Sequence, residues 1–176
     1  MKSFLEPFKD SLIFKILLAI MMFLFTWISN GQVERTSELY RTLKSKDSLI
    51  FERAFNRCEL EKLEPIIAEN FEFYHDIIGI QNRKEFIAAV KTNICKNPGN
   101  VRRQLVVKSL IVFPLKKKGI LYGAIQKGKH TFQKKSKDKN EMKTSGIADF
   151  THLWILKNNS WKLKRILSYN HKSFSE

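Results

Sequence analysis

The pattern of apolar and polar positions is clearest in the closing segment, residues 150–171, which reads FTHLWILKNNSWKLKRILSYNH. Apolar and polar residues alternate on both sides of Asn158-Asn159, which is typical of two half-buried β-strands. Asparagine tolerates positive φ angles and bonds to its own backbone, so this pair favours a two-residue turn. The segment is therefore predicted to fold as an antiparallel hairpin.

The turn decides which side chains of the hairpin face one another, because strand side chains alternate between two faces. One face carries the cross-strand pairs Trp154 with Leu163, His152 with Arg165, Phe150 with Leu167, and Ala148 with Tyr169. The opposite face carries Thr151, Leu153 and Ile155 against Ile166, Lys164 and Lys162. We expect the aromatic face to point into the core, and the other face to be partly wet or to meet a partner.

His152 and Arg165 are a polar pair within the apolar row of the aromatic face. Buried polar groups need partners or a water-filled cavity, so the pair is expected to mark the polar point of a pocket wall. A purely structural pair, satisfied by water and backbone groups, is the alternative. The pairing depends on the two-residue turn, since a turn one residue longer would point Arg165 away from His152.

The chain between residues 36 and 95 has the apolar spacing of helices around one strand. A first helix is expected after Thr36 or Ser37, and the polar run 45–48 is a candidate break in it. A short second helix is expected around residues 60–67, and a third at 83–95 with Asn82 as its N-cap. Between them, FEFYHD at residues 71–76 reads as a strand. Phe71, Phe73 and His75 are expected to share one of its faces, and Glu72, Tyr74 and Asp76 the other.

Every element after Asn100 is predicted to be a strand. The expected strands cover residues 101–105, 107–115 and 120–132, and a long polar loop at 133–145 precedes the hairpin. Helices first and long strands last are typical of a single α+β domain, with the helices packed on one face of an antiparallel sheet.

Residues 1–31 have the pattern of a secretory signal peptide. Lysines precede the uncharged run ILLAIMMFLFTWI at residues 16–28, and Ser29 and Gly31 are the small residues that a signal peptidase requires. This run is shorter than the roughly 20 apolar residues of a spanning helix. We expect cleavage near Gly31-Gln32, leaving residues 32–176 as a periplasmic or extracellular domain without a stable membrane span. An uncleaved anchor is the alternative, because Glu6 and Asp10 weaken the signal.

The net charge of the chain indicates which classes of molecule it could bind. The chain has 32 Lys and Arg residues against 17 Asp and Glu, a net charge of +15, and loss of the leader leaves +14. Such a surface attracts nucleic acid, lipid headgroups or an acidic ligand. The lysines are dispersed without aromatic interleaving, so we favour a solvated exterior, and export argues against nucleic acid as a partner.

Two cysteines, Cys58 and Cys95, lie near predicted helix ends. Export permits a disulfide, but the sequence does not fix their separation. A buried free thiol is the more common outcome for such residues, so it is the expectation here.

Three stretches carry a resemblance to a known family: FEFYHD at 71–76, LYGAIQKGKHTF at 121–132, and the closing hairpin. Together with the element order they resemble the nuclear transport factor 2-like superfamily, which includes SnoaL-like cyclases, ketosteroid isomerases and exported bacterial domains of unknown function. The resemblance covers residues 34–173. It implies a cone-shaped domain whose curved sheet, closed by the helices, holds a pocket. It does not imply one activity, because the superfamily hosts both enzymes and binding modules.

The expected pocket combines the hairpin face with neighbouring strands. Tyr122, His130 and Phe132 have the parity to join it, although a bulge at Gly123 or Gly128 would reverse that parity. The candidate ligand-contacting residues are His152, Arg165, Tyr122, His130, Trp154, Tyr169, His75 and His171. No histidine pair has tight metal-ligand spacing, so we expect no metal and no cofactor.

Three functions remain open. The first is binding of an unknown small molecule in the pocket. The second is acid–base catalysis of the isomerase or cyclase kind, which needs a carboxylate base and a tyrosine donor in an apolar pocket. Its candidates are Asp76 or Asp149 as base and Tyr122, Tyr169 or Tyr74 as donor. The third is a homodimer or partner-binding module using the outer face formed by Thr151, Leu153, Ile155 and Ile166.

Overall fold

The computed structural model describes residues 12, 15–16, 31–136 and 141–174. The chain divides at Gly31 into two units, of which Gln32–Glu176 is the folded domain. The predicted signal peptide, residues 1–31, lies almost entirely outside the described residues. Within the described ranges, no helix combines the length and the apolar character needed to cross a membrane.

The first helix is longer and more continuous than expected. Ser37 caps α2 (Glu38–Ser48) by accepting a hydrogen bond from the Tyr40 N–H at 3.2 Å. Helix α2 then runs directly into the π-helical segment η2 (Leu49–Asn56). The expected break at residues 45–48 is therefore wrong, because Asp47 in that run is buried on the core side of a continuous helix.

The predicted second helix is reduced to one 3₁₀ turn, η3 (Leu60–Lys62), and strand β1 (Ile67–His75) begins where that helix was expected to end. The third helix consists of α3 (Arg83–Ala89) followed by the π-helical segment η4 (Val90–Ile94). Asn82 is its N-cap, as predicted. The Asn82 side chain and the Glu85 side chain each bond the other's backbone N–H, which satisfies two donors of the first turn.

The two cysteines form a disulfide, which corrects the expectation of free thiols. Cys58 follows η2 and Cys95 follows η4, and their Cα atoms lie 5.6 Å apart. The bridge therefore joins the ends of the two helical layers that cover the sheet.

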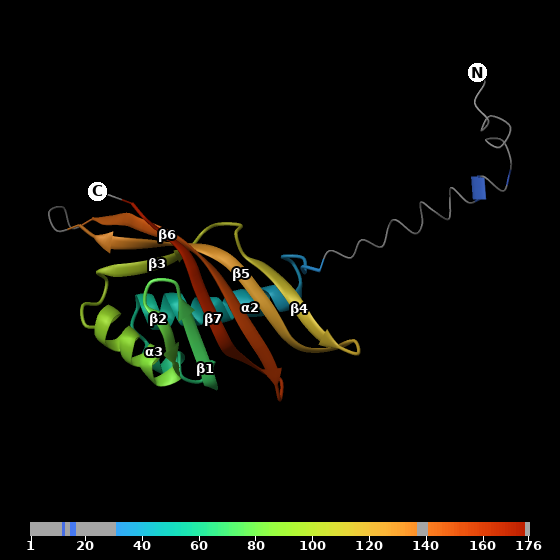
Figure 1. The fold of residues 1–176 in the computed structure, drawn as a ribbon, viewed down its shortest axis with the longest axis horizontal. Coiled ribbons are helices and arrows are strands. Elements are labelled where there is room, and N and C mark those ends of the chain that lie inside the picture. The colour runs from blue at the N-terminus through green and yellow to red at the C-terminus, as the bar shows by residue number, and fades with distance from the viewer. Residues whose placement is uncertain (1–11, 13–14, 17–30, 137–140, 175–176) are drawn as a thin grey trace, which may run out of the picture. The chain divides into compact units, whose positions relative to one another are not determined.

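One seven-stranded sheet holds the rest of the domain, in the order β2-β1-β7-β6-β5-β3, with β4 also pairing with β5. Its remaining strands are β2 (Gly79–Asn82), β3 (Val101–Leu105), β4 (Ile111–Lys117), β5 (Ile120–Lys135), β6 (Met142–Lys157) and β7 (Ser160–Ser173). Neighbours are antiparallel except β1 and β7, which are parallel. The sheet is strongly curved, with α2 and α3 along one face (Figure 1), which confirms the predicted α+β architecture.

Two strand boundaries differ from the predicted ones. Strand β4 begins at Ile111, so residues 107–110 belong to a connection and not to the strand expected at 107–115. Strands β5 and β6 extend to Lys135 and from Met142, so paired strand replaces much of the loop expected at 133–145.

The closing hairpin has the predicted turn but not the predicted register. Asn158 and Asn159 have φ angles of 49° and 56°, and Lys157 pairs with Ser160, as a two-residue turn requires. The expected pair of Trp154 with Leu163 is confirmed. Beyond it, register is lost, because a bulge adds one residue to β7.

The bulge lies at Lys164, since Trp154 pairs with Leu163 whereas Leu153 pairs with Arg165. An extra residue moves the following side chains of β7, from Arg165 to Tyr169, to the other face of the sheet. A second extra residue between Tyr169 and Lys172 restores the original parity. The expected pair of Ile155 with Lys162, which precedes the bulge, is also confirmed. The expected pairs beyond the bulge are wrong; the observed partners are Ile166 for His152, Ser168 for Phe150 and Tyr169 for Asp149.

The core lies between the helices and the inner face of the sheet. Ile166 and Ser168 are buried there, whereas Leu167 and Tyr169 are 40% and 37% exposed on the outer face. Ile166 is thus removed from the outer face on which it was expected. The largest fully buried side chains are Trp154, Phe71, Phe150, Leu43, Ile50, Leu63, Leu110, Leu163, His152, Gln126 and Val112.

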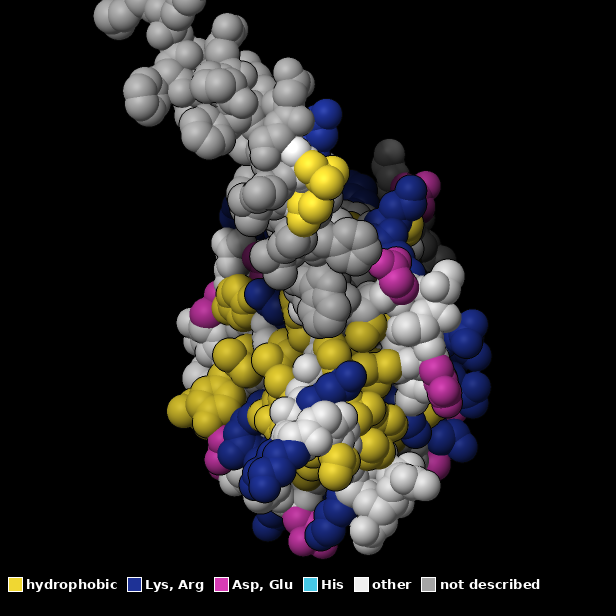
Figure 2. Space-filling view, turned by 90° about the vertical axis from the view of Figure 1, so that its right-hand side faces the viewer, with side chains coloured by type: hydrophobic (Ala, Val, Ile, Leu, Met, Phe, Trp, Pro, Cys, Tyr) yellow, Lys and Arg dark blue, Asp and Glu magenta, His cyan; other side chains and the backbone are white. Residues whose placement is uncertain are grey.

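Basic residues are spread over the surface. On the face drawn in Figure 2, Lys and Arg side chains stand in several separate places around a cluster of hydrophobic side chains, and a few acidic side chains lie among them. This distribution agrees with a solvated lysine-rich exterior on that face.

Candidate functional site

A partly open cavity of about 350 Å³ lies between the inner face of the sheet and the segments η2, α3 and η4. Eight of its eighteen lining residues carry aromatic rings, and no Asp, Glu or Tyr of the described residues belongs to its lining. The rings come from Phe51, Phe55, Phe73, Phe86 and Phe132 and from His75, His130 and His152.

Strand alternation places two of these histidines. His130 on β5 and His152 on β6 point inward with Phe150, and both are almost fully buried. A Cβ atom on Gly128 would lie 2.8 Å from the Phe150 ring, so only glycine leaves that ring room over β5. His130 in turn stacks on Phe150 at 5.4 Å between ring centroids. The register of β5 and β6 therefore places the polar rings of His130 and His152 among the aromatic side chains of the cavity wall.

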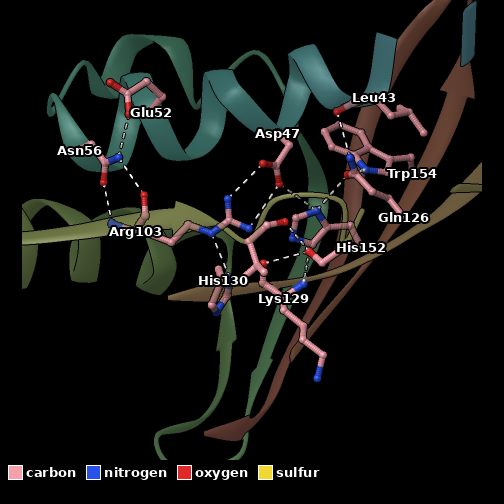
Figure 3. A network of polar contacts seen from close by, with 12 residues as sticks. Leu43, Asp47, Glu52, Asn56, Arg103, Gln126, Lys129, His130, His152 and Trp154 are labelled. Carbon is pink, nitrogen blue, oxygen red and sulfur yellow. Dashed lines mark hydrogen bonds and ion pairs between the residues drawn. The ribbon is translucent and has the colours of Figure 1, made fainter. Parts of the chain in front are cut away.

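A buried ion pair supports the wall from behind (Figure 3). Arg103 on β3 is 4% exposed, and its guanidinium donates to both carboxylate oxygens of Asp47, at 3.0 and 3.4 Å. The guanidinium carbon lies 3.4 Å from the centre of the Phe51 ring, which suits a cation–π contact. The Asn56 side chain bonds the Arg103 backbone N–H and C=O, at 2.8 and 2.9 Å. Arg103 is therefore fixed in one position.

Arg103 sets the tautomer of His130. Its Nε–H donates to His130 Nδ1 at 2.9 Å. Because an arginine nitrogen is only a donor, Nδ1 must accept, and the ring hydrogen must lie on Nε2. Burial, followed by the positive charge of Arg103, lowers the pKa of His130 from 6.5 to about 2, so the ring is neutral.

Gln126 sets the opposite tautomer in His152. The Gln126 amide nitrogen donates to the Leu43 carbonyl at 3.1 Å, and its Oε1 accepts from Trp154 Nε1–H at 2.8 Å. The same oxygen lies 3.1 Å from His152 Nδ1, which must therefore donate. This leaves Nε2 of His152 as an acceptor, and burial followed by the charge of Arg103 holds its pKa well below 6.5.

Acid is expected to destabilise the domain through His130. The unfolded chain binds a proton near pH 6.5 and the folded chain only near pH 2, so stability is present above pH 6.5 and lost as the pH falls below it. His130 alone is expected to remove about 2 kcal/mol between pH 7 and pH 5. Urea unfolding at both pH values measures the difference. His130→Asn should lose less over the same interval, and a wild type equally stable at both would contradict the assignment.

Other predicted site residues lie away from the cavity. Arg165 faces outward and bonds Glu72 at 2.7 Å and the Asn70 carbonyl at 2.7 Å, because the bulge moved it off the inner face; the predicted pairing with His152 is wrong. Tyr122 and Tyr169 are 44% and 37% exposed. Trp154 is buried in the core against Gln126 and is absent from the cavity lining.

His75 and His171 form a separate pair beside the cavity, with ring centroids 4.1 Å apart and an angle of 21°. His75 lines the cavity, and its Nδ1 accepts from the Ile77 and Ile78 N–H groups. His171 Nδ1 bonds Asp76, and its Nε2 lies 3.3 Å from the Ser168 hydroxyl.

Ligand atoms of His75, Asp76 and His171 lie within 4.8 Å of one another, which is the spacing of a metal site. The two rings are stacked, however, so their in-plane lone pairs run side by side, and a metal needs both nitrogens to point at it from about 2.1 Å. Backbone N–H groups also occupy His75 Nδ1. The arrangement fits a hydrogen-bonded pair better than a metal centre.

Three candidates for an isomerase-like site, Asp76, Tyr74 and Tyr169, line one open depression of about 300 Å³, but none of them belongs to the lining of the aromatic cavity. Asp149 is held by Lys129 at 3.0 Å and by the Asn170 amide at 2.6 Å. The Tyr74 hydroxyl is bonded to Glu72 at 2.5 Å on the outer face. Asp76 lies beside His171, outside the cavity lining.

Sequence reasoning missed Asp47, Arg103 and Gln126. Asp47 follows Leu43 by four positions and precedes Phe51 by four, so it lies on the apolar stripe of its helix. Gln126 shares the parity of Ala124 and His130 along β5, and both neighbours are buried. A polar residue at a core position was the signal in both cases. Arg103 likewise shares the parity of Val101 and Leu105 along β3, whereas Arg102 shares that of Gln104.

Comparisons with known proteins give the family of folds. No protein-family model matches the chain, and no curated protein matches it. Solved structures do, at low sequence identity. A nuclear transport factor 2-like protein of Cytophaga hutchinsonii aligns with a TM-score of 0.55 and 13% identity over 76% of this chain and 98% of that one.

Two further structures have named roles of their own. The association domain of C. elegans CaMKII has a TM-score of 0.60 and 10% identity over 78% of this chain and 100% of that one. Hexachlorocyclohexane dehydrochlorinase LinA-type3 of Novosphingobium barchaimii has a TM-score of 0.55 and 13% identity, over 79% and 95%. Such identities establish the fold alone. Residues 32–176 therefore have the nuclear transport factor 2-like fold that the sequence motifs indicated.

Proposed function

We propose that this chain is an exported domain that binds a small, largely apolar molecule in the cavity between its helices and the inner face of its sheet. The observation that carries the proposal is the partly open cavity of about 350 Å³, whose lining is rich in aromatic rings. Ligand pockets of roughly 300–1,000 Å³ have this composition: apolar walls with a few fixed polar groups. Apolar volume left unfilled lowers stability, so a cavity of this size favours a ligand-binding role.

The composition of the walls argues for binding over catalysis of the isomerase kind. That chemistry needs a carboxylate base and a hydroxyl donor next to the substrate. The described lining contains neither Asp, Glu nor Tyr, and its histidines are held neutral by burial. A larger depression of about 590 Å³ lies beside α2, but it is more open and its walls include Arg41, Lys44 and Glu52. Charged, solvated walls make it the weaker candidate.

Two features support export. The leader has the charge and apolar pattern of a signal peptide, and Cys58 is bridged to Cys95 in the folded domain. Disulfides persist in oxidising compartments and are rare in the cytosol. The proposal therefore assigns the domain to the periplasm or the extracellular space.

Native mass spectrometry of the chain recovered after export tests the proposal. It is expected to report a polypeptide that begins near Gln32 and carries a noncovalently retained small molecule. A chain that begins at Met1 would contradict cleavage. A bare chain that also takes up no apolar compound would contradict ligand binding.

A cavity-filling variant sharpens this test. Ala89 lines the cavity, whereas the adjacent Ala88 is exposed and outside the lining. Ala89→Phe is expected to reduce ligand retention at least tenfold, because the new ring occupies the space of the ligand. Ala88→Phe is the matched control and should retain ligand like the wild type, as measured by the bound fraction in native mass spectra. Equal retention in both variants would place the ligand elsewhere.

A second candidate role is self-association through the outer face. Tyr74 pairs with Ile80 on one side and Leu167 on the other, so three exposed apolar side chains form a row across β2, β1 and β7. Their exposed fractions are 37%, 66% and 40%. Contiguous apolar surface of this kind marks protein interfaces, and one similar structure is named an association domain. The same native mass spectra report whether the chain is a dimer.

A further inference from the structure

Three side chains of the cavity lining carry a buried polar atom that has no partner within the described residues: Gln81 Oε1, His130 Nε2 and His152 Nε2. The two histidine nitrogens belong to the neighbouring strands β5 and β6. Both side chains line the cavity, and they are 3% and 0% exposed. A buried polar atom without a hydrogen bond costs about 1–3 kcal/mol. Two such atoms on one apolar wall are therefore the part of the site that a ligand has most to gain from contacting.

The two atoms differ in character, and their inner partners fix the difference. Arg103 donates to His130 Nδ1 at 2.9 Å, which leaves a hydrogen on Nε2. Gln126 Oε1, whose identity is set by the Trp154 N–H, accepts from His152 Nδ1 at 3.1 Å, which leaves a lone pair on Nε2. The wall thus offers one neutral donor and one neutral acceptor.

The charge of the wall is also fixed. Arg103 is the cation nearest the two rings, and Asp47 compensates it at 3.0 Å. Lys134 is the one Lys or Arg side chain of the described cavity lining, and it is exposed. An anionic ligand would face the lone pair of His152, and a cationic ligand would face the hydrogen of His130. Neither charge finds a buried counter-charge on this wall.

Resting on the proposed function, we propose that the ligand is an uncharged molecule with an apolar, ring-sized skeleton and a hydroxyl function, which accepts from His130 Nε2–H and donates to His152 Nε2. A hydroxyl group supplies both an acceptor and a donor, whereas an ether or ketone supplies only an acceptor. Phe51 on η2 and Phe73 on β1 belong to the cavity lining and would contact the skeleton.

Four naphthalene probes test this assignment: naphthalene, 2-methoxynaphthalene, 2-naphthol and 2-naphthoate. Their affinities for the exported chain, freed of retained ligand, are measured by isothermal titration calorimetry. We expect 2-methoxynaphthalene to bind about fivefold more tightly than naphthalene, and 2-naphthol about fivefold more tightly again, one step for each net hydrogen bond. 2-Naphthoate should bind most weakly, because its charge is desolvated without a partner.

Asparagine variants separate the two contacts. The side chain of asparagine can replace the Nδ1 contact of each histidine while removing the Nε2 atom. His130→Asn is expected to remove the advantage of 2-methoxynaphthalene over naphthalene, whereas 2-naphthol should keep an advantage of about fivefold from its bond to His152 Nε2. His152→Asn should remove only the advantage of 2-naphthol over 2-methoxynaphthalene. Tyr122→Phe, on an exposed side chain outside the lining, is the control and should leave all affinities unchanged.

The outcomes distinguish this inference from the function on which it rests. If the three neutral probes bind with equal affinity, and Ala89→Phe abolishes their binding, the cavity binds ligands but the hydroxyl assignment is overturned. Tightest binding of 2-naphthoate also overturns it. If no probe binds, both the inference and the proposed function are overturned. Should an asparagine variant fail to fold, the order of the four probes on the wild type still decides.

Discussion

Cys58→Ser is expected to lower the free energy of unfolding by about 4 kcal/mol. The bridge to Cys95 spans 37 residues of sequence, which include β1, β2 and α3. Cross-linking a loop of this length removes conformational entropy from the unfolded chain, and the loss of that restraint sets the magnitude. Urea unfolding of the oxidised wild type and the variant measures the difference.

Two controls separate the bridge from the substitution itself. The double variant Cys58→Ser/Cys95→Ser should unfold at the same urea concentration as either single variant. The wild type under reducing conditions should match all of them, because each lacks the same cross-link. A reduced wild type as stable as the oxidised one would show that the bridge does not stabilise the domain.

The bridge also matters for the cavity. It ties the chain just after η2 to the chain just after η4, and these two segments supply Phe55 and Ile94 to the cavity lining. Reduction is therefore expected to weaken ligand retention as well as stability. A loss of ligand retention on reduction would show that the bridge positions the cavity walls. A loss of stability alone would show that it only restrains the unfolded chain.

Local signals predicted much of the fold. Asn82 is the N-cap of α3, Asn158 and Asn159 form the hairpin turn, and β3 covers residues 101–105. In each case the deciding chemistry lies within a few residues: a side chain that bonds a nearby N–H, a residue that tolerates positive φ, or the Pro98-Gly99 turn that precedes β3. These are short-range effects, so one sequence is enough to read them.

The candidate site depended on longer-range effects. The bulge at Lys164 turned Arg165 outward, where it bonds Glu72 and the Asn70 carbonyl of the parallel strand β1. The segment KLKRIL contains no residue type that predicts a bulge. The bulge depends on how β7 pairs with the strands on both of its sides, β1 and β6. His130 and His152 were named correctly as inward residues, but their hydrogen-bond partners were not.

Asp47 is the instructive error. Its place between Ser45 and Ser48 suggested a helix break, yet its spacing from Leu43 and Phe51 put it on the buried stripe of a continuous helix. A carboxylate on such a stripe requires a buried cation. Arg103, 56 residues later in the chain, supplies this cation. The local composition and the helical period conflicted, and the period was the better guide.

Asp47→Asn is expected to destabilise the domain by about 3–5 kcal/mol. The amide keeps the size of the carboxylate but removes the charge that compensates Arg103. The side chains of both partners are almost fully buried, at 5% and 2% exposure, so water cannot replace the lost interaction. Burial lowers the pKa of Arg103 and Asp47 opposes that effect, which indicates a guanidinium that depends on its partner for charge compensation.

Glu52→Gln is the matched control, since the carboxylate side chain of Glu52 on the adjoining η2 is 37% exposed and pairs with the exposed Arg57, and the new amide oxygen can still accept the Asn56 hydrogen bond. It should cost less than about 1 kcal/mol, and its cost should shrink at high salt. The cost of Asp47→Asn should not shrink, because a buried pair is screened far less. Guanidinium chloride would itself screen charges, so urea with and without sodium chloride is the appropriate denaturant.

The double variant Asp47→Leu/Arg103→Met completes the cycle. Replacing both members of a buried ion pair by apolar side chains of similar volume leaves no uncompensated charge, so the double variant should be more stable than Asp47→Asn. It also removes the donor to His130 Nδ1 at 2.9 Å, which frees that ring to exchange its tautomers. The preference for 2-naphthol over 2-methoxynaphthalene should survive, because His152 keeps its bond to Gln126. A double variant no more stable than Asp47→Asn would mean that shape, and not charge, makes this pair indispensable.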